Sequence, residues 1–273
     1  MKIAFIIKKD CPRCAKIVKR IDDILPQEWE RIYAEELRPF IKEKEYRPLE
    51  EIEADILFTI GGDGTVLLAA QKAKGAILGI NMGSLGFLSE VEVGKVEETV
   101  YRIIRGEHRF VEYMRLEVMV NGEIVGYALN EVVVHSNRIA KVRNFKLYLD
   151  GSFVERTRAD GIIVATPIGS TSYSLSAGGP IVMPATQAMV ISYLAPVTLR
   201  IRPMVAPSTS VLDILVSGID QDCLIIMDGQ KEVNFKSTDK VTITRASKSY
   251  KFITLRRDFY AKLREKLLKD VVN

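Results

Sequence analysis

The chain has 273 residues, of which 47% are hydrophobic and 27% are charged, and this composition excludes an intrinsically disordered protein. The net charge of +4 is spread over 39 basic and 35 acidic residues, which does not indicate a nucleic-acid partner but is compatible with a small polyanionic ligand. No apolar stretch reaches the roughly 20 residues that span a bilayer, and the apolar start 1–7 runs directly into Lys8, Lys9 and Asp10. Because a signal peptide is therefore not indicated, we expect a cytoplasmic protein without a membrane partner.

The first part of the chain alternates between predicted strands and helices. Segments 2–7, 55–60 and 76–80 are apolar and typical of buried strands, whereas 14–25 has the apolar spacing of a helix. The charged run 42–45 indicates a solvated loop or helix end. This alternation predicts a parallel, helix-covered sheet, in which ligands bind at the carboxyl ends of the strands.

A glycine-rich turn lies between the predicted strand 55–60 and the helix-like segment 66–70. Its sequence is Gly61-Gly62-Asp63-Gly64-Thr65, and such a turn lets backbone N–H groups approach a phosphate at the start of a helix. Asp63 would repel a phosphate unless it holds a metal ion, accepts a proton or binds a sugar hydroxyl, and a helix-capping aspartate in a tight turn is the structural alternative. A second ligand-permissive loop, 81–87, follows the next strand, so we expect both loops at one edge of the sheet.

The three cysteines do not form a disulfide framework of the secreted kind. Cys11 and Cys14 have the spacing of a redox dithiol at the expected start of a helix. We favour two incidental residues in a turn, because a lone pair at this spacing is a weak motif. A zinc site is not expected, since neither His108 nor His135 lies near the pair.

After about residue 109 the pattern becomes β-rich. The dipeptides Asn121-Gly122 and Asp150-Gly151 predict hairpin turns. The expected strands are 111–120, 123–135, 145–149, 153–157, 161–166, 190–193, 211–216, 224–227 and 240–244. A helical pattern over 258–268 ends the chain and could return to the first domain. We therefore expect an α/β Rossmann-like domain over 1–108, joined by about 250–273, and a mainly antiparallel β-rich domain over 109–249.

One stretch of this second half, 166–180, is dense in hydroxyl groups, and a short helix is expected over 170–177. Its hydroxyls and amides could bind a nucleotide, and Tyr173 offers a ring for stacking on a base. A seryl nucleophile is the competing interpretation, but the chain has no Gly-x-Ser-x-Gly elbow and no obvious histidine partner. A polar loop that caps the sheet remains the third.

Other polar groups precede this stretch. Asn130 and Glu131 interrupt an apolar strand and place an amide and a carboxylate on opposite faces. Arg156, Arg158 and Asp160 precede another buried strand; guanidinium groups suit phosphate, and carboxylates suit ribose hydroxyls, amides or magnesium. For Arg156 we prefer a surface ion pair.

Taken together, these motifs resemble those of the NAD kinase family, in the same order and over essentially the whole chain. The glycine motif alone is shared with diacylglycerol, sphingosine and phosphofructokinases, so the later motifs carry the distinction. The resemblance rests on Gly61-Gly62-Asp63-Gly64-Thr65, Asn81-x-Gly83-x-Leu85-Gly86-Phe87, Asn130-Glu131, Asp160-Gly161, Thr166-Pro167-x-Gly169-Ser170-Thr171-x-Tyr173-x-x-Ser176-x-Gly178-Gly179-Pro180, Arg202-Pro203-Met204-Val205-x-Pro207 and Asp228-Gly229-Gln230.

The resemblance implies phosphorylation of the adenosine ribose 2′-hydroxyl of NAD to give NADP. The donor would be ATP or polyphosphate with magnesium or another divalent cation, and the protein would be a homodimer or homotetramer. A lipid kinase is the alternative, although it should show an apolar acceptor groove that 166–180 does not resemble. A non-catalytic NAD sensor ranks third, because Asp63 and the glycine turn are intact.

By the same resemblance, Asp63 is the presumed proton acceptor. Asn81 and Phe87 would line the adenosine pocket, segment 171–176 would surround adenine and nicotinamide, and Asp160 would reach a neighbouring subunit's site. The implied nucleotide-binding residues are Gly62, Gly64, Thr65, Asn81, Phe87, Asn130, Glu131, Lys141, Arg158, Asp160, Thr171, Ser172, Tyr173, Ser174, Leu175, Ser176 and Gln230. No side chain is expected as a dedicated metal ligand.

The chain departs from the family pattern at Leu68, where many members carry a basic residue, and at Ser84, where many bacterial members carry a histidine. Lys141 stands where arginine is frequent and keeps only the charge. The residues that hold the donor phosphates therefore stay open: Lys72, Lys74 or a basic residue from another segment could serve.

Overall fold

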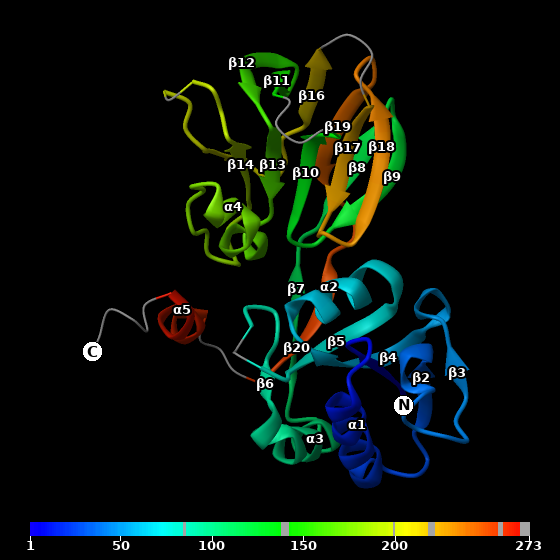
Figure 1. Cartoon of the computed structure of the whole chain (residues 1–273). Helices are drawn as coiled ribbons and strands as arrows, with labels where there is room; N and C mark the ends of the chain where they lie inside the picture. Colours follow the sequence, from blue (N-terminus) through cyan, green and yellow to red (C-terminus); the bar gives the residue numbers. More distant parts are fainter. Residues whose placement is uncertain (84–85, 138–141, 199, 218–221, 256–258, 268–273) are drawn as a thin grey trace. The chain divides into compact units, whose positions relative to one another are not determined.

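The structure, a computed structural model, describes residues 1–83, 86–137, 142–198, 200–217, 222–255 and 259–267. The chain forms two compact units (Figure 1). Unit 1 comprises Met1–Glu112 and Lys251–Asn273, and unit 2 comprises Tyr113–Tyr250. None of the described helices is both long enough and apolar enough to cross a bilayer.

Unit 1 is built on an eight-stranded sheet with the strand order β3-β2-β1-β4-β5-β20-β7 and with β6 beside β5. The pairs from β3 across to β20, and that of β5 with β6, are parallel, which confirms the predicted parallel sheet. The strands are β1 (Lys2–Ile7), β2 (Glu30–Ala34), β3 (Tyr46–Arg47), β4 (Glu53–Gly61), β5 (Lys74–Asn81), β6 (Val91–Glu92), β7 (Arg109–Tyr113) and β20 (Tyr250–Thr254).

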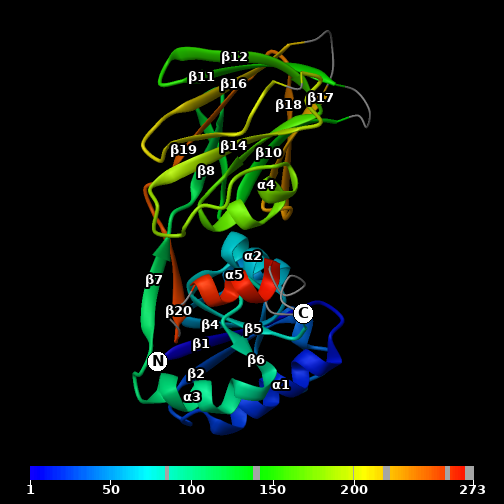
Figure 2. The same cartoon turned by 90° about the vertical axis from the view of Figure 1, so that its left-hand side faces the viewer.

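Helices cover both faces of this sheet. Alternate residues of β1, such as Phe5, share one core with α1 and α3. Helix α2 covers the opposite face of the sheet (Figures 1 and 2). Its buried residues are not part of the core around α1 and α3, and it contacts β4 and β5. The helical elements of unit 1 are α1 (Pro12–Ile24), η1 (Glu35–Leu37), η2 (Leu49–Glu51), α2 (Asp63–Lys72), η3 (Val93–Lys95), α3 (Val96–Ile104) and α5 (Phe259–Leu267).

Unit 2 is a sandwich of two antiparallel six-stranded sheets, as predicted for the β-rich half. The strand orders are β15-β14-β13-β10-β17-β18 and β12-β11-β16-β19-β8-β9. Inward side chains of both sheets, including Val132, Phe145 and Ile214, form one core, because successive residues of a strand point to opposite faces. The elements are β8 (Leu116–Val120), β9 (Glu123–Ala128), β10 (Glu131–Ser136), β11 (Arg143–Leu149), β12 (Ser152–Ala159), β13 (Gly161–Ala165), η4 (Ile168–Thr171), α4 (Tyr173–Ser176), β14 (Ala188–Leu194), β15 (Met204–Pro207), β16 (Leu212–Ser217), β17 (Asp222–Met227), β18 (Lys231–Lys236) and β19 (Lys240–Arg245).

Three sequence-based expectations need correction. The predicted strand 111–120 is divided into β7 and β8, and 123–135 is divided into β9 and β10. The second break falls at Leu129 and Asn130, whose backbone N–H groups bond to a side chain instead of a neighbouring strand. The helix expected over 170–177 is two short pieces, η4 and α4, because Ser172 between them has a non-helical backbone.

Other elements were missed. The strands β2, β3, β6, β15, β18 and β20 and the helix α3 had no counterpart among the predicted segments. Several are short or half polar, so their apolar pattern is weak. The charged run 42–45 lies in an exposed loop, as expected.

Candidate active site

The glycine-rich turn lies at the carboxyl end of β4, directly before α2, as predicted. A Cβ atom on Gly61 would lie 2.2 Å from Oγ1 of Thr65, so only glycine fits there. Gly62 and Gly64 have open space at the same position. Their backbone is therefore accessible to a ligand at the start of a helix, where negative charge is favoured.

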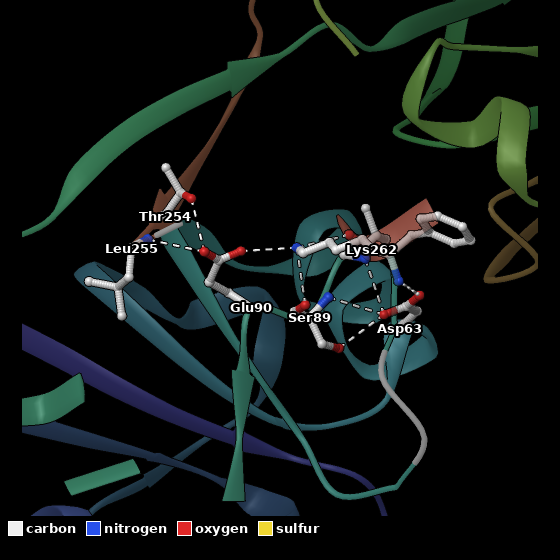
Figure 3. A network of polar contacts seen from close by, with 8 residues as sticks. Asp63, Ser89, Glu90, Thr254, Leu255 and Lys262 are labelled. Carbon is white, nitrogen blue, oxygen red and sulfur yellow. Dashed lines mark hydrogen bonds and ion pairs between the residues drawn. The ribbon is translucent and has the colours of Figure 1, made fainter. Parts of the chain in front are cut away.

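The carboxylate of Asp63 binds the segment that follows the second loop. Its Oδ2 accepts a hydrogen bond from the Phe87 amide at 2.7 Å, and its Oδ1 accepts from the Leu88 amide at 3.3 Å and from the amide and Oγ of Ser89 at 3.1 and 2.9 Å. The N-cap of α2 is Gly62, without a side-chain cap. The helix-cap alternative for Asp63 is therefore wrong, since this side chain holds a distant segment in place (Figure 3).

Close packing accompanies these bonds. A Cβ atom on Gly86 would lie 1.8 Å from Oδ1 of Asp63, whereas Gly83 has open space around it. Gly86 is thus required for the carboxylate to reach its partners.

A pocket of about 520 Å³ adjoins this turn. Three cationic side chains from separate elements reach it: Lys8 after β1, Arg13 in α1 and Lys266 in α5. Its walls are formed by Lys8, Cys11, Arg13, Gly61, Gly62, Asp63, Asn81, Met82, Gly83, Gly86 and Lys266. Cations together with glycine backbone suit a polyanion such as a nucleotide phosphate.

The lysines suggested from the sequence as phosphate-binding residues do not line this pocket. The suggested Lys72 pairs with Glu50 at 2.9 Å, and the suggested Lys74 pairs with Glu53 at 3.5 Å; neither lines the pocket. Sequence reasoning missed the three cations that do. Only Lys8 carried a usable signal, since it directly follows the carboxyl end of a predicted strand.

Cys11 and Cys14 are joined by a disulfide at the first turn of α1, and Cys223 is buried elsewhere, in unit 2. The interpretation of two incidental residues is therefore wrong. Cys11 is also part of the pocket wall. The helix turn places the two thiols close enough to bond, which the spacing allowed but did not require.

Four further residues of unit 1 were predicted to bind the nucleotide: Asn81, Phe87, Thr65 and Gly64. Asn81 lines the pocket, and its Oδ1 accepts a hydrogen bond from the Gly83 amide at 3.1 Å. The half-buried Phe87 ring lies 6.2 Å from that of Phe259 and 4.4 Å from Nζ of Lys266. Thr65 is buried over Gly61, which indicates a packing role, and Gly64 is exposed.

In unit 2 the carboxylate of Asp228 fixes the backbone of Asn130 and Glu131. It accepts hydrogen bonds from the amides of Leu129, Asn130 and Glu131 at 2.8, 2.7 and 3.1 Å. On the other side, the Thr166 hydroxyl donates to the Leu129 carbonyl at 2.6 Å, and the Thr166 amide donates to the Asn130 carbonyl at 2.8 Å. The segment is therefore held from two directions.

This scaffold buries two polar side chains, each with one oxygen that lacks a hydrogen-bond partner among the described residues. Asn130 is 5% and Glu131 is 7% exposed, and neither Oδ1 of Asn130 nor Oε2 of Glu131 meets a hydrogen-bond donor among the described residues. Burial, with a smaller contribution from the charge of Asp228, raises the pKa of Glu131 to about 8. Buried acceptors are ordinarily satisfied, so these two suit the hydroxyl or amino groups of a ligand.

The predicted hydroxyl segment serves partly to build the fold. Ser174 is fully buried, with its Oγ 2.9 Å from that of Ser192, and the Thr171 hydroxyl donates to the Ile168 carbonyl at 3.2 Å. These two hydroxyls are therefore engaged internally. Tyr173, however, is 46% exposed, as a ring available for stacking requires. Ser172 and Leu175 are half-buried and Ser176 is exposed.

The other predicted residues of unit 2 lie on different elements. Arg158 is exposed on β12, Asp160 is half-buried between β12 and β13, and Gln230 is exposed in the turn between β17 and β18. Lys141 lies outside the described residues.

Comparison with known proteins identifies the family. Residues 12–108 match the ATP-NAD kinase N-terminal domain, and residues 129–255 match the ATP-NAD kinase C-terminal domain. The chain belongs to the ATP-NAD kinase family. The family predicted from the sequence and its NAD kinase function are thereby confirmed, and no finding supports the lipid kinase alternative.

Relatives and solved structures agree with this membership. The chain is 50% identical to an NAD kinase of Thermoplasma acidophilum over the whole length of both, and 38% identical to one of Thermococcus kodakarensis over 98% of this chain and 99% of the other. A yeast NADH kinase complexed with NADH has a TM-score of 0.89 at 25% identity, covering 100% of this chain and 89% of the other. An NAD kinase from Archaeoglobus fulgidus in complex with ATP has a TM-score of 0.79 at 30% identity, covering 97% and 98%.

Proposed function

We propose that this ATP-NAD kinase transfers the terminal phosphoryl group of ATP, or of polyphosphate, to the 2′-hydroxyl of the adenosine ribose of NAD. The observation that carries the proposal is the Asp63 carboxylate, held by three backbone amides at the wall of a cationic, glycine-lined pocket. Such a fixed acceptor beside a phosphate site suits phosphoryl transfer to a hydroxyl.

Asp63 would take the hydroxyl proton through Oδ2. Its Oδ1 already accepts three hydrogen bonds, from Leu88 and from the amide and Oγ of Ser89, whereas Oδ2 accepts one, from Phe87. Oδ2 therefore keeps room for the substrate hydroxyl. In the reaction the ribose oxygen bonds to the terminal phosphorus, and the bond from that phosphorus to its bridging oxygen breaks. ADP leaves when ATP is the donor, or a polyphosphate one unit shorter when polyphosphate is, and the proton passes to Oδ2.

Lys8 and Arg13 would hold the donor phosphates together with the backbone of Gly62. Both side chains are exposed and line the pocket. Guanidinium and ammonium groups neutralise phosphate charge, and an amide at a helix start adds a hydrogen bond.

Magnesium, or another divalent cation, would reach the site with the donor phosphates and neutralise their charge. Among the described residues there is no group of three or more histidine, cysteine, aspartate or glutamate side chains that could hold a metal. This fits an ion bound mainly by phosphate and water, as magnesium usually is at nucleotide sites.

The NAD-binding residues would come mainly from the β-rich domain, proposed as 109–249, with 1–108 and about 250–273 forming the other. Asn130 and Glu131 would bind ribose or adenine groups with their unpartnered oxygens, and Tyr173 would stack on a ring. The further proposed contacts are Gly64, Thr65, Asn81, Phe87, Lys141, Arg158, Asp160, Thr171, Ser172, Ser174, Leu175, Ser176 and Gln230. Because Thr65, Thr171 and Ser174 are engaged inside the fold, they would act through packing or backbone groups.

We further propose a cytoplasmic homodimer or homotetramer, in which Asp160 reaches a neighbouring subunit's site. The support is the edge strand β12, whose Phe153 is 58% exposed near its start and which ends at Ala159, directly before Asp160. Light scattering would determine the number of subunits, and a monomer at assay concentration would contradict the proposal.

The test of the function is NADP formation from NAD, run in parallel with ATP and with polyphosphate. Each donor is assayed with magnesium and with a chelator. NADP from either donor supports the acceptor assignment and identifies the donor. NAD binding without any NADP would instead favour a sensor.

A further inference from the structure

Helix α5 forms hydrogen bonds with segment 87–90, whose amides at 87–89 bind the Asp63 carboxylate. Nζ of Lys262 donates to Oε2 of Glu90 at 2.9 Å and to the carbonyls of Ser89 and Phe87 at 3.3 and 3.4 Å (Figure 3). These contacts use all three donors of the ammonium group. The side chains of Lys262 and Glu90 are only 14% and 8% exposed, so water competes little for them.

Glu90 is anchored on its other side as well. Its Oε1 accepts hydrogen bonds from the Thr254 hydroxyl at 3.0 Å and from the Leu255 amide at 3.1 Å, at the end of β20. One carboxylate thus joins the sheet to α5 through Lys262, as Figure 3 shows.

The backbone of 87–89 is consequently held from two sides. Its amides donate to Asp63, while two of its carbonyls accept from Lys262. Because amides and carbonyls of one segment move together, a shift of Lys262 would displace the donors that orient the Asp63 carboxylate.

One turn further along α5, Lys266 faces Asp63 itself. Its Nζ lies 3.8 Å from Oδ2 of Asp63 and 4.4 Å from the Phe87 ring centroid, and it lines the pocket beside the glycine turn. Residues four apart share one face of a helix, so the contacts of Lys262 also set the position of Lys266. A cation here offsets the repulsion between Asp63 and a phosphate, which the glycine turn alone does not resolve.

We propose that α5 completes the phosphate-transfer site. Lys266 contacts the donor phosphate beside Asp63, and the Lys262–Glu90 pair positions both Lys266 and the amides that hold Asp63. This inference rests on the proposed function, because it assigns the donor phosphate to the pocket next to Asp63.

Substitution of Lys266 tests the phosphate contact. In Lys266→Met we expect ATP binding, measured without NAD, to weaken roughly 10- to 100-fold, from the usual strength of charge-assisted hydrogen bonds. The KM for NAD should stay within about 2-fold, and Lys266→Arg should recover most of the ATP affinity, since it restores the charge. The charge-matched control is Lys72→Met, which removes a cation that pairs with Glu50 outside the pocket.

The two hypotheses fail in different ways. If the wild-type protein forms no NADP, the proposed function is wrong. The ATP titrations would still test whether Lys266 contacts the donor phosphate, because they are made without NAD. If Lys266→Met binds ATP as tightly as Lys72→Met does, the role of Lys266 is wrong even when NADP forms.

Lys262 and Glu90 are tested by comparing a single with a double variant. Lys262→Met leaves the Glu90 charge buried and should lower both the Tm and kcat. Lys262→Met with Glu90→Gln removes the unpaired charge, so the Tm should recover while kcat stays at least about 10-fold low, because the carbonyls of 87 and 89 still lack their donor. Recovery of kcat together with the Tm would show that the pair only stabilises the fold, and would overturn the positioning role.

Discussion

Two aspartates, Asp63 in unit 1 and Asp228 in unit 2, bind the backbone in the same way but in different surroundings. Each carboxylate accepts hydrogen bonds from three successive amides, of 87–89 and of 129–131 respectively. The side chain of Asp63 is 28% exposed, faces Lys266 and lines a pocket. Asp228 is only 4% exposed and lies under the segment that presents Asn130 and Glu131.

The difference shows that the hydrogen-bond pattern alone does not define the role of a carboxylate. Exposure and neighbouring charge separate the two, since only a carboxylate that reaches a pocket can meet a substrate. We therefore expect loss of Asp63 to affect turnover and loss of Asp228 to affect stability.

The largest expected effect is the loss of turnover in Asp63→Asn. The amide cannot accept the ribose proton, so turnover should fall at least about 100-fold, the usual size of a general-base contribution. NAD affinity, measured by equilibrium titration, should stay close to that of the wild type. Near-normal turnover would make Asp63 a structural residue like Asp228.

The next largest expected effect is the loss of stability in Asp228→Asn. The amide nitrogen would face a backbone N–H, so the free energy of unfolding should fall by about 2 kcal/mol, as expected when a buried donor loses its partner. Urea unfolding measures this value, and kcat per folded molecule should change less than about 3-fold. If kcat falls as far as in Asp63→Asn with stability unchanged, the division of roles between the two aspartates is wrong.

A smaller effect separates two glycines of the second loop. In Gly86→Ala the new Cβ would displace the Asp63 carboxylate, so kcat should fall about 10-fold for a misplaced acceptor. The matched control is Gly83→Ala, where the Cβ meets open space. Equal kcat values for the two variants would show that the position of Asp63 does not limit turnover.

The last prediction concerns how the stability of the protein depends on pH through Glu131 in unit 2. The pKa of Glu131 is about 8 in the folded chain and 4.5 ordinarily, so the folded state binds more protons between these values. The free energy of unfolding should therefore fall as the pH rises through this window, by at most about 1.4 kcal/mol per pH unit from this group. Glu131→Gln removes the titration, and its stability relative to the wild type should increase with pH. A difference that does not change with pH would contradict the raised pKa.

Much of the fold followed from local sequence patterns. The strands β1, β4 and β5 are runs of buried apolar residues, and Asn121-Gly122 allows a tight turn with positive φ, as observed at both residues. Elements with weaker patterns, such as β18 with its exposed Lys231 and Glu232, were missed because pairing with β17, rather than their own composition, makes them strands.

The sequence by itself determined the family, the two kinds of sheet and the position of Asp63 at a strand-to-helix turn, because these depend on residues adjacent along the chain. Only the tertiary structure decided what Asp63 binds and which cations reach its pocket. Lys8, Arg13 and Lys266 come from segments as far apart as the first strand and the last described helix. No local sequence pattern predicts that these three side chains lie together, since this depends on how the helices pack on the sheet and which side chain each turn presents.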